Sequence, residues 1–214
     1  MSRIVVFGAG GAAGRLISAE AAARGHEVIA VTRRPVPGLT FPDGVRVVAG
    51  DATSEASVRS VAEGADAVVL AVGGPGRALW RDAAAAVVGA LGGLPEPRPR
   101  VIHMGGGATL TTPDGTRFLE LPTFPEAYLD PATGQAAALD YYLTTDGAVP
   151  WTYISPPPVD FRRGERTGGY RTGGDQPVLD SAGESRLSYE DFAVVVVDEI
   201  ETPKHPNQRF TAAY

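Results

Sequence analysis

Cysteine is absent from this chain of 214 residues, and only one of its 19 basic residues, Lys204, is a lysine. Without cysteine, disulfides and thiolate metal sites are excluded, and we expect no bound metal ion. No run approaches the roughly 20 consecutive apolar residues of a membrane-spanning helix. A strand-like run begins at Ile4, which leaves no room for the basic and apolar regions of a signal peptide. We therefore expect a cytoplasmic protein without a membrane partner.

An excess of acidic residues gives the chain a formal net charge of −6 and an isoelectric point near 5.1. A general nucleic-acid binder needs a basic face, so we expect no nucleic-acid partner. Hydrophobic residues make up 43% of the sequence, which is ordinary for a soluble globular protein. The length favours a single domain that spans residues 1–214.

Glycine is abundant, and its most informative cluster stands near the start of the chain. The apolar run Ile4–Phe7 predicts a buried strand, and an alanine-rich helix is expected soon after it. Between them, Gly8, Gly11 and Gly14 recur at every third position. Glycine permits a tight turn with φ > 0 and lets the backbone approach a pyrophosphate, which the helix N-terminus also attracts. This context favours a dinucleotide site over a plain strand-to-helix turn.

Two arginines follow the second expected strand, Glu27–Val31, where an NAD-binding protein would carry an acidic residue. Arg33 and Arg34 suit the 2′-phosphate of NADP(H), because guanidinium groups form paired hydrogen bonds with phosphate. The alternative is that both are ordinary solvated surface charges. We expect NADP(H) to be favoured over NAD(H).

The loop after the third expected strand, Val45–Ala49, carries Asp51 and Thr53. Asp51 suits a contact with the adenine amino group of the cofactor. Either residue also suits the N-cap of the next helix. The sequence leaves both interpretations open.

Strands and helices continue to alternate, which predicts an α/β fold with a doubly wound parallel sheet of the Rossmann type, in the strand order 3-2-1-4-5-6. A small C-terminal appendage is expected on the substrate side, together with the long loops 105–130 and 156–187. The later strands are expected at 65–72, 101–104, 151–155 and 208–212, with short strand-like pieces near Tyr170 and Val178. The helices are expected at 12–24, 54–63, 77–91 and 132–145, and from the S-x-x-D cap at Ser188.

Glycines after the fourth and fifth expected strands would let a ligand lie across the strand tips, although the first of these stretches also suits a plain turn. Thr109 is a weak catalytic candidate, because its hydroxyl suits a hydrogen bond to the acceptor, but a structural role is favoured for it. His103 is expected in the core. The expected cofactor-binding residues are Gly8, Gly10, Gly11, Ala12, Ala13, Gly14, Arg33, Arg34, Asp51, Ala52, Ala71, Val72, Gly73, Met104, Gly105 and Pro156.

Several stretches together point to a known family. They are the glycine motif, the arginine pair, G-D-A-T at 50–53, G-G-G-A at 105–108, W-T-Y-I-S-P at 151–156, G-E-R-T-G at 164–168 and S-Y-E-D-F-A at 188–193. In these stretches the chain resembles the NmrA-like, atypical branch of the short-chain dehydrogenase/reductase superfamily. It is similar in particular to bacterial NADH-flavin reductases akin to flavin reductase/biliverdin IXβ reductase. The resemblance implies a Rossmann-type fold and NADP(H) binding.

One departure from that superfamily bears on the chemistry. Its usual catalytic pair is Tyr-x-x-x-Lys, and no such pair can be written here, because the only lysine is Lys204. Alcohol–ketone chemistry by that pair is therefore disfavoured, as are the epimerases and dehydratases that use it. We predict an NADPH-dependent oxidoreductase, a monomer or homodimer, that transfers hydride to a flavin, quinone or similar flat small-molecule acceptor. The alternative is a non-catalytic NADP(H)-binding redox sensor or regulatory protein.

The arginine pair generates a direct prediction. If Arg33 binds the 2′-phosphate, Arg33→Ala removes a charge-assisted hydrogen bond worth about 1.5–3 kcal/mol. NADPH affinity should then fall by about 10–150-fold, while NADH affinity hardly changes. Calorimetric titration with both cofactors measures this, and equal losses for the two would contradict the assignment.

Overall fold

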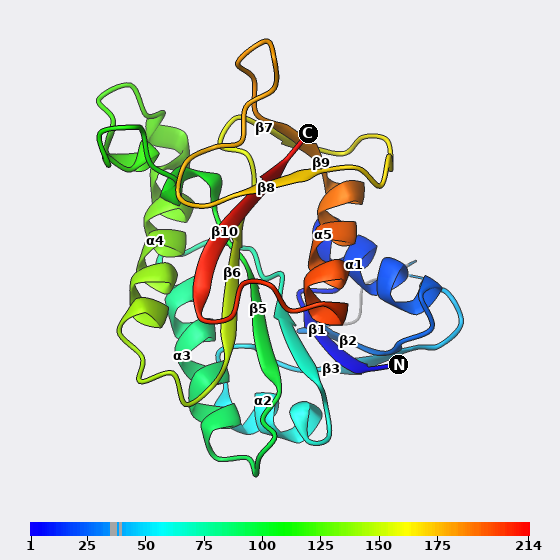
Figure 1. The fold of residues 1–214 in the computed structure, drawn as a ribbon. Coiled ribbons are helices and arrows are strands. Elements are labelled where there is room, and N and C mark those ends of the chain that lie inside the picture. The colour runs from blue at the N-terminus through cyan, green and yellow to red at the C-terminus, as the bar shows by residue number, and fades with distance from the viewer. Residues whose placement is uncertain (35–37, 39) are drawn as a thin grey trace.

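The computed structural model describes residues 1–34, 38 and 40–214, in which an eight-stranded sheet lies between two layers of helices (Figure 1). The strand order is β3-β2-β1-β4-β5-β6-β10-β8. All neighbouring strands are parallel except β8, which is antiparallel to β10. The strands of this sheet are β1 Arg3–Phe7, β2 Glu27–Thr32, β3 Val45–Ala49, β4 Ala67–Leu70, β5 Arg100–Met104, β6 Trp151–Ser155, β8 Arg171–Gly173 and β10 Gln208–Ala213.

Helices α1 and α5 cover one face of the sheet, and α2, α3 and α4 cover the other. Short 3-10 turns, η1, η2 and η3, fill the long connection between β5 and α4. A separate two-stranded sheet pairs β7 with β9 in parallel. These elements are α1 Ala12–Ala23, α2 Glu55–Ala62, α3 Ala78–Gly92, η1 Gly107–Thr109, η2 Phe118–Glu120, η3 Glu126–Tyr128, α4 Leu129–Leu143, β7 Asp160–Arg162, β9 Arg186–Ser188 and α5 Tyr189–Glu201.

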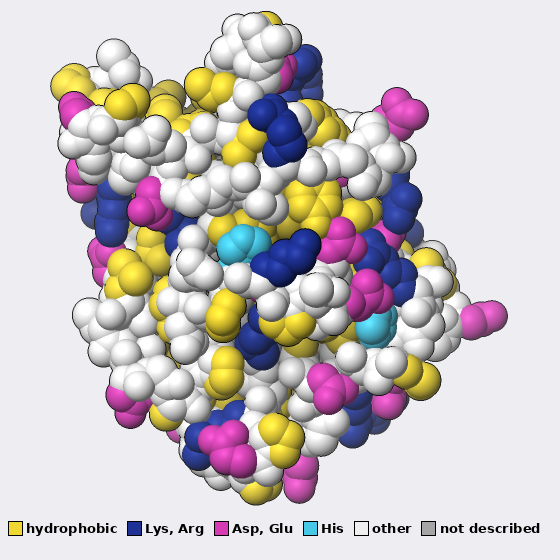
Figure 2. All heavy atoms as spheres, viewed as in Figure 1, with side chains coloured by type: hydrophobic (Ala, Val, Ile, Leu, Met, Phe, Trp, Pro, Cys, Tyr) yellow, Lys and Arg dark blue, Asp and Glu magenta, His cyan; other side chains and the backbone are white. Residues whose placement is uncertain are grey.

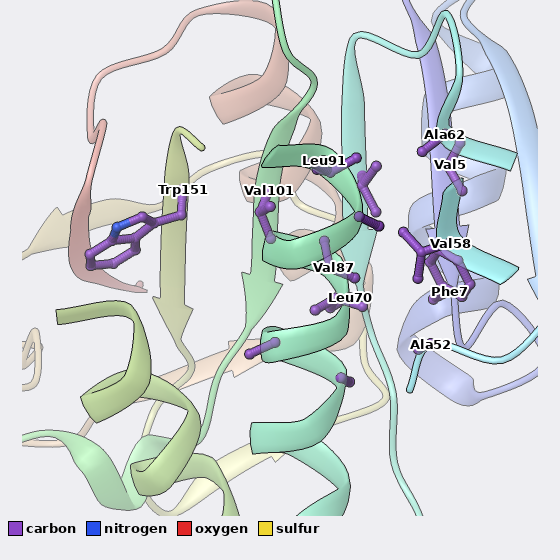
Figure 3. Packing of buried hydrophobic residues seen from close by; sticks show 14 of the residues in the cluster. Val5, Phe7, Ala52, Val58, Ala62, Leu70, Val87, Leu91, Val101 and Trp151 are labelled. Atoms are coloured by element: carbon purple, nitrogen blue, oxygen red, sulfur yellow. The ribbon is translucent and has the colours of Figure 1, made fainter. Parts of the chain in front are cut away.

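Strand β1 contributes to the core on both faces of the sheet, because successive side chains of a strand point to opposite sides. Ile4 and Val6 pack in the cluster beneath α1 and α5. Val5 and Phe7 pack in the cluster beneath α2, α3 and α4, part of which Figure 3 shows. All four are at most 1% exposed, and full burial of such a side chain stabilises the fold by about 1.5–3 kcal/mol. This explains why the sequence shows a continuous apolar run here rather than an alternating one.

The expected fold class is confirmed, because the first six strands of the sheet stand in the order of a Rossmann-type doubly wound sheet. The fourth strand is shorter than expected and comprises only Ala67–Leu70. At its start, the N–H of Ala65 closes the preceding helix by donating to the Ala62 carbonyl oxygen. Beyond its end, the Val72 carbonyl oxygen accepts a hydrogen bond from the Trp80 indole instead of a ladder bond.

The C-terminal region differs most from expectation. The piece expected near Tyr170 is β8, but it joins the main sheet rather than an appendage. The strand expected near Val178 is absent from the structure, which has none between 174 and 185. Val178 lies against Gly173 instead, where a Cβ on that glycine would come 2.7 Å from the valine side chain. The appendage itself is the β7–β9 pair, and neither of these two strands was expected from the sequence.

One face of the molecule can be compared with the expectation that no nucleic acid binds. On the face seen in Figure 2, acidic and basic side chains are interspersed rather than gathered by sign. Of the helices in the described part of the chain, none has the length and apolar character required to cross a membrane. The absence of a nucleic-acid partner stays a prediction.

Helix α1 lies unusually close to the turn that precedes it. At Gly14, a Cβ would overlap the backbone carbonyl of Gly8, and this contact is to backbone, which cannot rotate away. Ser18, one turn further along, donates a 2.8 Å hydrogen bond to the Gly14 carbonyl oxygen. The third glycine of the motif therefore sets how closely α1 packs on the end of β1.

Gly14→Ala should lower the free energy of unfolding by about 1–3 kcal/mol, because a methyl group has to be forced into a filled space. Gly92→Ala is the matched control, since it also adds a methyl to a helical glycine but meets its nearest atom, on Val149, only at 3.9 Å. Its effect should stay below about 1 kcal/mol. Urea unfolding of both variants tests this, and equal destabilisation would contradict the packing argument.

Candidate functional site

A cleft of about 560 Å³ runs across the carboxyl ends of β1, β2, β4 and β5. We call it the strand-end cleft. Ligands of open α/β sheets bind at this edge, where the connections diverge to opposite faces. Of the residues expected at the cofactor site, those that line the cleft are Gly8, Gly10, Gly11, Ala12, Ala13, Arg33, Arg34, Asp51, Ala52, Ala71, Val72, Gly73 and Met104.

The floor of the cleft is the turn between β1 and α1. Gly8 has φ +79°, and a Cβ there would also overlap the carbonyl group of Ala71 on the neighbouring strand end. Only glycine satisfies both conditions, since L side chains rarely adopt this conformation. The turn is closed by a 2.9 Å hydrogen bond from the Gly11 N–H to the Gly8 carbonyl oxygen.

The N-terminus of α1 opens into this cleft. Gly11 is its N-cap in an extended conformation, and no side chain of the described residues caps it. Ala12 and Ala13, the first two helical residues, line the cleft. The first N–H groups of a helix have no partner within the helix, and they attract anions together with the helix dipole. This arrangement fits a pyrophosphate.

One end of the cleft carries positive charge. Arg33 and Arg34 follow β2 and are exposed, and both line the cleft. Asp51 lies opposite them at the end of β3. Hydrogen bonds from the backbone and hydroxyl of Thr53, with a smaller contribution from the charge of Arg33, lower the pKa of Asp51.

The helix-cap interpretation of Asp51 and Thr53 is wrong. Ser54 is the N-cap of α2, and its Oγ accepts a 3.3 Å hydrogen bond from the Ser57 N–H. The Asp51 Oδ1 atom accepts bonds from the N–H and the Oγ1 of Thr53, at 2.9 and 2.8 Å. Asp51 does not cap α2 and lines the cleft. Its contact with adenine stays a prediction.

The segment after β4, which includes Val72 and Gly73, is fixed by a hydrogen bond from Trp80 of α3. The Trp80 indole Nε1 donates a 3.1 Å hydrogen bond to the Val72 carbonyl oxygen, and the tryptophan is only 5% exposed. Gly134 of α4 lies directly against this ring, where a Cβ would come 2.5 Å from its carbon atoms. The packing of α3 on α4 thereby fixes the part of the cleft wall formed by Val72 and Gly73.

Gly14, Gly105 and Pro156 are not among the residues that line the cleft, and their part in cofactor binding stays a prediction. Gly14 is used in packing α1, as described above. At Gly105, a Cβ would overlap the ring of Tyr153, so this glycine allows β5 and β6 to pack closely. Pro156 is buried, and its carbonyl oxygen lies 2.8 Å from where a Cβ on Gly107 would stand.

Thr109 is also not among the residues that line the cleft. It is fully buried, its Oγ1 donates a 2.7 Å hydrogen bond to the Gly106 carbonyl oxygen, and it lies 3.1 Å from the Ser155 Oγ. These contacts give the threonine a structural role. His103 is likewise a core residue, beside the Tyr142 hydroxyl, and burial lowers the pKa of its imidazole to about 3.

Six residues of the cleft wall were not expected from the sequence. Tyr189 is the most informative, because it is the first residue of α5 and reaches the cleft from a distant part of the chain. The S-x-x-D cap at Ser188 marks this helix start, but nothing local indicates which strand ends it faces. The six residues are Phe7, Val31, Thr32, Gly50, Leu79 and Tyr189.

Comparison with known proteins decides the family. The model of the NAD(P)H-binding family matches residues 8–203 of this chain. The chain belongs to the NAD(P)H-binding family. This confirms the resemblance inferred from the sequence, and it supports a nicotinamide cofactor without distinguishing NADP(H) from NAD(H).

Solved structures of similar proteins share the fold over their full length. One is a protein of Burkholderia pseudomallei, provisionally described as exported, with 36% identity and a TM-score of 0.87 over 100% of both chains. A second, provisionally an epimerase of Bacteroides thetaiotaomicron, has 31% identity and a TM-score of 0.89 over 100% of this chain and 97% of that one. A third, provisionally an NADH-flavin reductase of Streptococcus pneumoniae, has 30% identity and a TM-score of 0.86 over 100% of this chain and 99% of that one.

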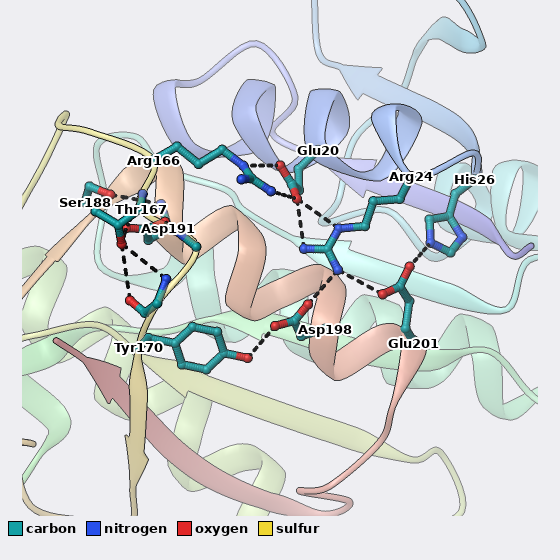
Figure 4. A network of polar contacts seen from close by, with 12 residues as sticks. Glu20, Arg24, His26, Arg166, Thr167, Tyr170, Ser188, Asp191, Asp198 and Glu201 are labelled. Atoms are coloured by element: carbon teal, nitrogen blue, oxygen red, sulfur yellow. Dashed lines mark hydrogen bonds and ion pairs between the residues drawn. The ribbon is translucent and has the colours of Figure 1, made fainter.

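In this NAD(P)H-binding protein, the 164–168 loop makes polar contacts with both α1 and α5 (Figure 4). Arg166 of that loop donates to Glu20 of α1 through Nε and Nη2, at 2.9 and 2.7 Å. Glu20 also accepts a 2.9 Å bond from Arg24. Arg24 in turn pairs with Asp198 of α5 at 2.5 Å. The loop, α1 and α5 are thus joined by one ionic network.

Asp191, in the first turn of α5, holds the same loop from the other side. Its carboxylate accepts hydrogen bonds from the Thr167 N–H and Oγ1, at 3.1 and 2.7 Å, and from the Gly168 N–H at 2.7 Å. It also accepts a 2.7 Å bond from the Tyr214 hydroxyl. Burial opposes ionisation, but these bonds outweigh it and lower the pKa of Asp191.

Asp191→Asn should destabilise this NAD(P)H-binding protein near neutral pH by about 1–3 kcal/mol, because the loop N–H groups lose a charged acceptor. The folded carboxyl has a lowered pKa, so its contribution is complete above the unfolded value near 3.9 and is lost as pH falls through the folded value. The stability difference between wild type and variant should therefore shrink below about pH 4. Urea unfolding at a series of pH values measures it.

Asp146→Asn is the control for this experiment, since from residues 1–34, 38 and 40–214 Asp146 accepts only a local 3.0 Å bond, from the Ala148 N–H. It should cost less at every pH. A wild-type advantage over Asp191→Asn that persists unchanged into acid would contradict the role of the ionised carboxylate.

Proposed function

We propose that this protein is an NADPH-dependent oxidoreductase that transfers hydride to a flavin, a quinone or a similar flat, electron-poor small molecule. The observation that carries the proposal is the composition of the strand-end cleft. Glycines and a free helix N-terminus fit a pyrophosphate at its centre, and Arg33 and Arg34 stand at one end. At β5 and α5 the wall consists of Met104 and Tyr189, which suit a flat ring. Family membership and the flavin-reductase relative support the same class of reaction.

The preference for NADPH rests on charge at the end of β2. Two guanidinium groups stand where a carboxylate would select NAD. The nearest acid on the cleft wall, Asp51, is engaged by Thr53. A guanidinium presents paired donors to a phosphate, so the arrangement favours the 2′-phosphorylated cofactor.

The proposed chemistry requires little from the side chains. When bound, the reduced nicotinamide supplies a hydride, which carries two electrons to the acceptor, while a proton comes from solvent. The cleft binds the pyrophosphate, fixes the position of the cofactor and holds the acceptor ring against it. Such positioning is a large source of rate enhancement in its own right, and the hard chemistry belongs to the cofactor.

Tyrosine acid–base catalysis is not part of this proposal. Lys204, the chain's only lysine, is exposed in the segment after α5. The residue four positions before it is Ile200, not a tyrosine. Tyr142 and Tyr153, on α4 and β6, are fully buried, and burial raises the pKa of each hydroxyl. A raised pKa is the opposite of the change that the lysine produces in the Tyr–Lys pair.

We further propose that residues 1–214 act as one domain, with the loops 105–130 and 156–187 on the substrate side. A cytoplasmic location and a monomeric or homodimeric state belong to the same proposal. Of the similar proteins described above, the one from Burkholderia pseudomallei is provisionally described as exported.

An assay of NADPH oxidation with FMN, riboflavin and quinones tests the function. We expect turnover with at least one acceptor, and a kcat/KM for NADPH about 10-fold or more above that for NADH, from the phosphate contact of Arg33. Arg33→Ala should reduce this preference, and Arg98→Ala is a matched control, because Arg98 contacts Glu96 and Leu94 outside the cleft.

Absence of turnover with every acceptor would contradict the reductase. Unequal calorimetric affinities for NADP+ and NADPH, together with a captured protein partner, would then favour a redox sensor.

A further inference from the structure

Tyr189 is a cleft residue that the phosphate-binding half of the site does not use. It is the first residue of α5, it is half-buried, and it lines the strand-end cleft. Its aromatic neighbour Phe161 packs on the same core cluster as Met104 and Ala71, which form the cleft wall at the ends of β5 and β4. Tyr189 thus shares the cleft with the residues at the ends of β4 and β5, where the proposed function brings the nicotinamide and the acceptor together.

The ring is backed by other aromatic residues. Its centroid lies 4.4 Å from that of Phe161, with an interplanar angle of 66°. Phe161 makes a second edge-to-face contact with Phe192, at 5.2 Å, and Phe192 is fully buried. An edge-to-face contact covers at most one face of each ring, so Phe161 leaves at least one face of Tyr189 uncovered.

The backbone around Tyr189 is fixed on both sides. Ser188 caps α5 by accepting a 2.9 Å hydrogen bond from the Asp191 N–H. Glu190 accepts a 2.8 Å bond from the Gly164 N–H and a 2.5 Å bond from the Arg163 Nε. Residues 188, 190 and 191 are therefore all tied to the 163–168 segment or to the helix itself. A ring anchored in this way loses little conformational freedom when it binds a ligand.

We propose that Tyr189 is the residue that binds the acceptor, by stacking its ring on the flat ring system of the molecule that receives the hydride. The inference rests on the proposed reductase function and assigns a specificity-determining residue to it. Aromatic pairs gain from offset-stacked geometry in addition to the burial of their surface. The ring of Tyr189 thus selects planar aromatic or quinonoid acceptors over small aliphatic ones.

Steady-state kinetics with FMN and a simple quinone test the assignment in Tyr189→Ala and Tyr189→Phe. We expect the acceptor KM to rise by about 10-fold in the alanine variant and to stay within about twofold in the phenylalanine variant, which keeps the ring. The KM for NADPH should stay within about twofold in both. Tyr141→Ala is the matched control, because Tyr141 is half-buried like Tyr189 but lies on α4, outside the cleft and outside both substrate-side loops.

A second measurement does not depend on turnover. Riboflavin fluorescence, titrated with protein saturated with NADP+, gives the acceptor affinity of each variant directly. Acceptor binding that Tyr189→Ala weakens supports the inference, even if no turnover is seen and the reductase proposal fails. Turnover with an acceptor KM and affinity unchanged in Tyr189→Ala overturns the inference and leaves the reductase standing.

Two further results would overturn the assignment. An equal loss of NADPH affinity in Tyr189→Ala would place the ring on the cofactor instead of the acceptor. Failure of wild-type protein to bind any flat acceptor, with no turnover, would overturn both proposals. Circular dichroism and thermal unfolding of each variant establish that it is folded before its affinity is compared.

Discussion

The close approach of three backbone segments at Gly8 is the constraint on which the rest of the molecule depends. Its positive φ turns the chain from β1 into α1, and the space for a Cβ is already filled by the Ala71 carbonyl group at the end of β4. Gly14 then lets α1 lie against the same turn. Strand, helix and neighbouring strand are thereby fixed together, and the helix N-terminus is left open toward solvent. The anion-binding geometry is a direct result of this packing.

The C-terminal half of the chain supplies one residue of the cleft wall, Tyr189, and is tied to α1 through charged side chains. Arg166 and Arg24 join the 164–168 loop, α1 and α5 through Glu20 and Asp198. Asp191 holds the same loop from within α5. Each ion pair at a partly exposed surface contributes little alone, but together they connect α1 to α5, the helix that begins with Tyr189. The stretches G-E-R-T-G at 164–168 and S-Y-E-D at 188–191 are thus hydrogen-bonded to each other.

The sequence was sufficient for the sheet order and for most of the cleft, because both depend on local patterns. Apolar runs identify buried strands, and the glycine motif and Arg33 each stand directly after a strand end. The sequence was insufficient where contacts between distant parts of the chain determine the position of a residue. Gly105 has the same sequence signature as Gly73, but it serves the contact with Tyr153 instead of the cleft. Tyr189 could not be assigned to the cleft, because its position follows from how α5 packs beside α1 on one face of the sheet. Val178 is apolar and β-branched, but it packs on Gly173 rather than entering a ladder.

The scarcity of lysine has a practical consequence. Lys204 follows the C-terminal end of α5, whereas Tyr189 begins that helix at the cleft. A helix of 13 residues is roughly 20 Å long. The chain's only lysine and the strand-end cleft therefore lie at opposite ends of the same helix. Among the side chains, reagents that acylate amines would attach a label or a solid support only at Lys204, at the end of α5 away from the cleft.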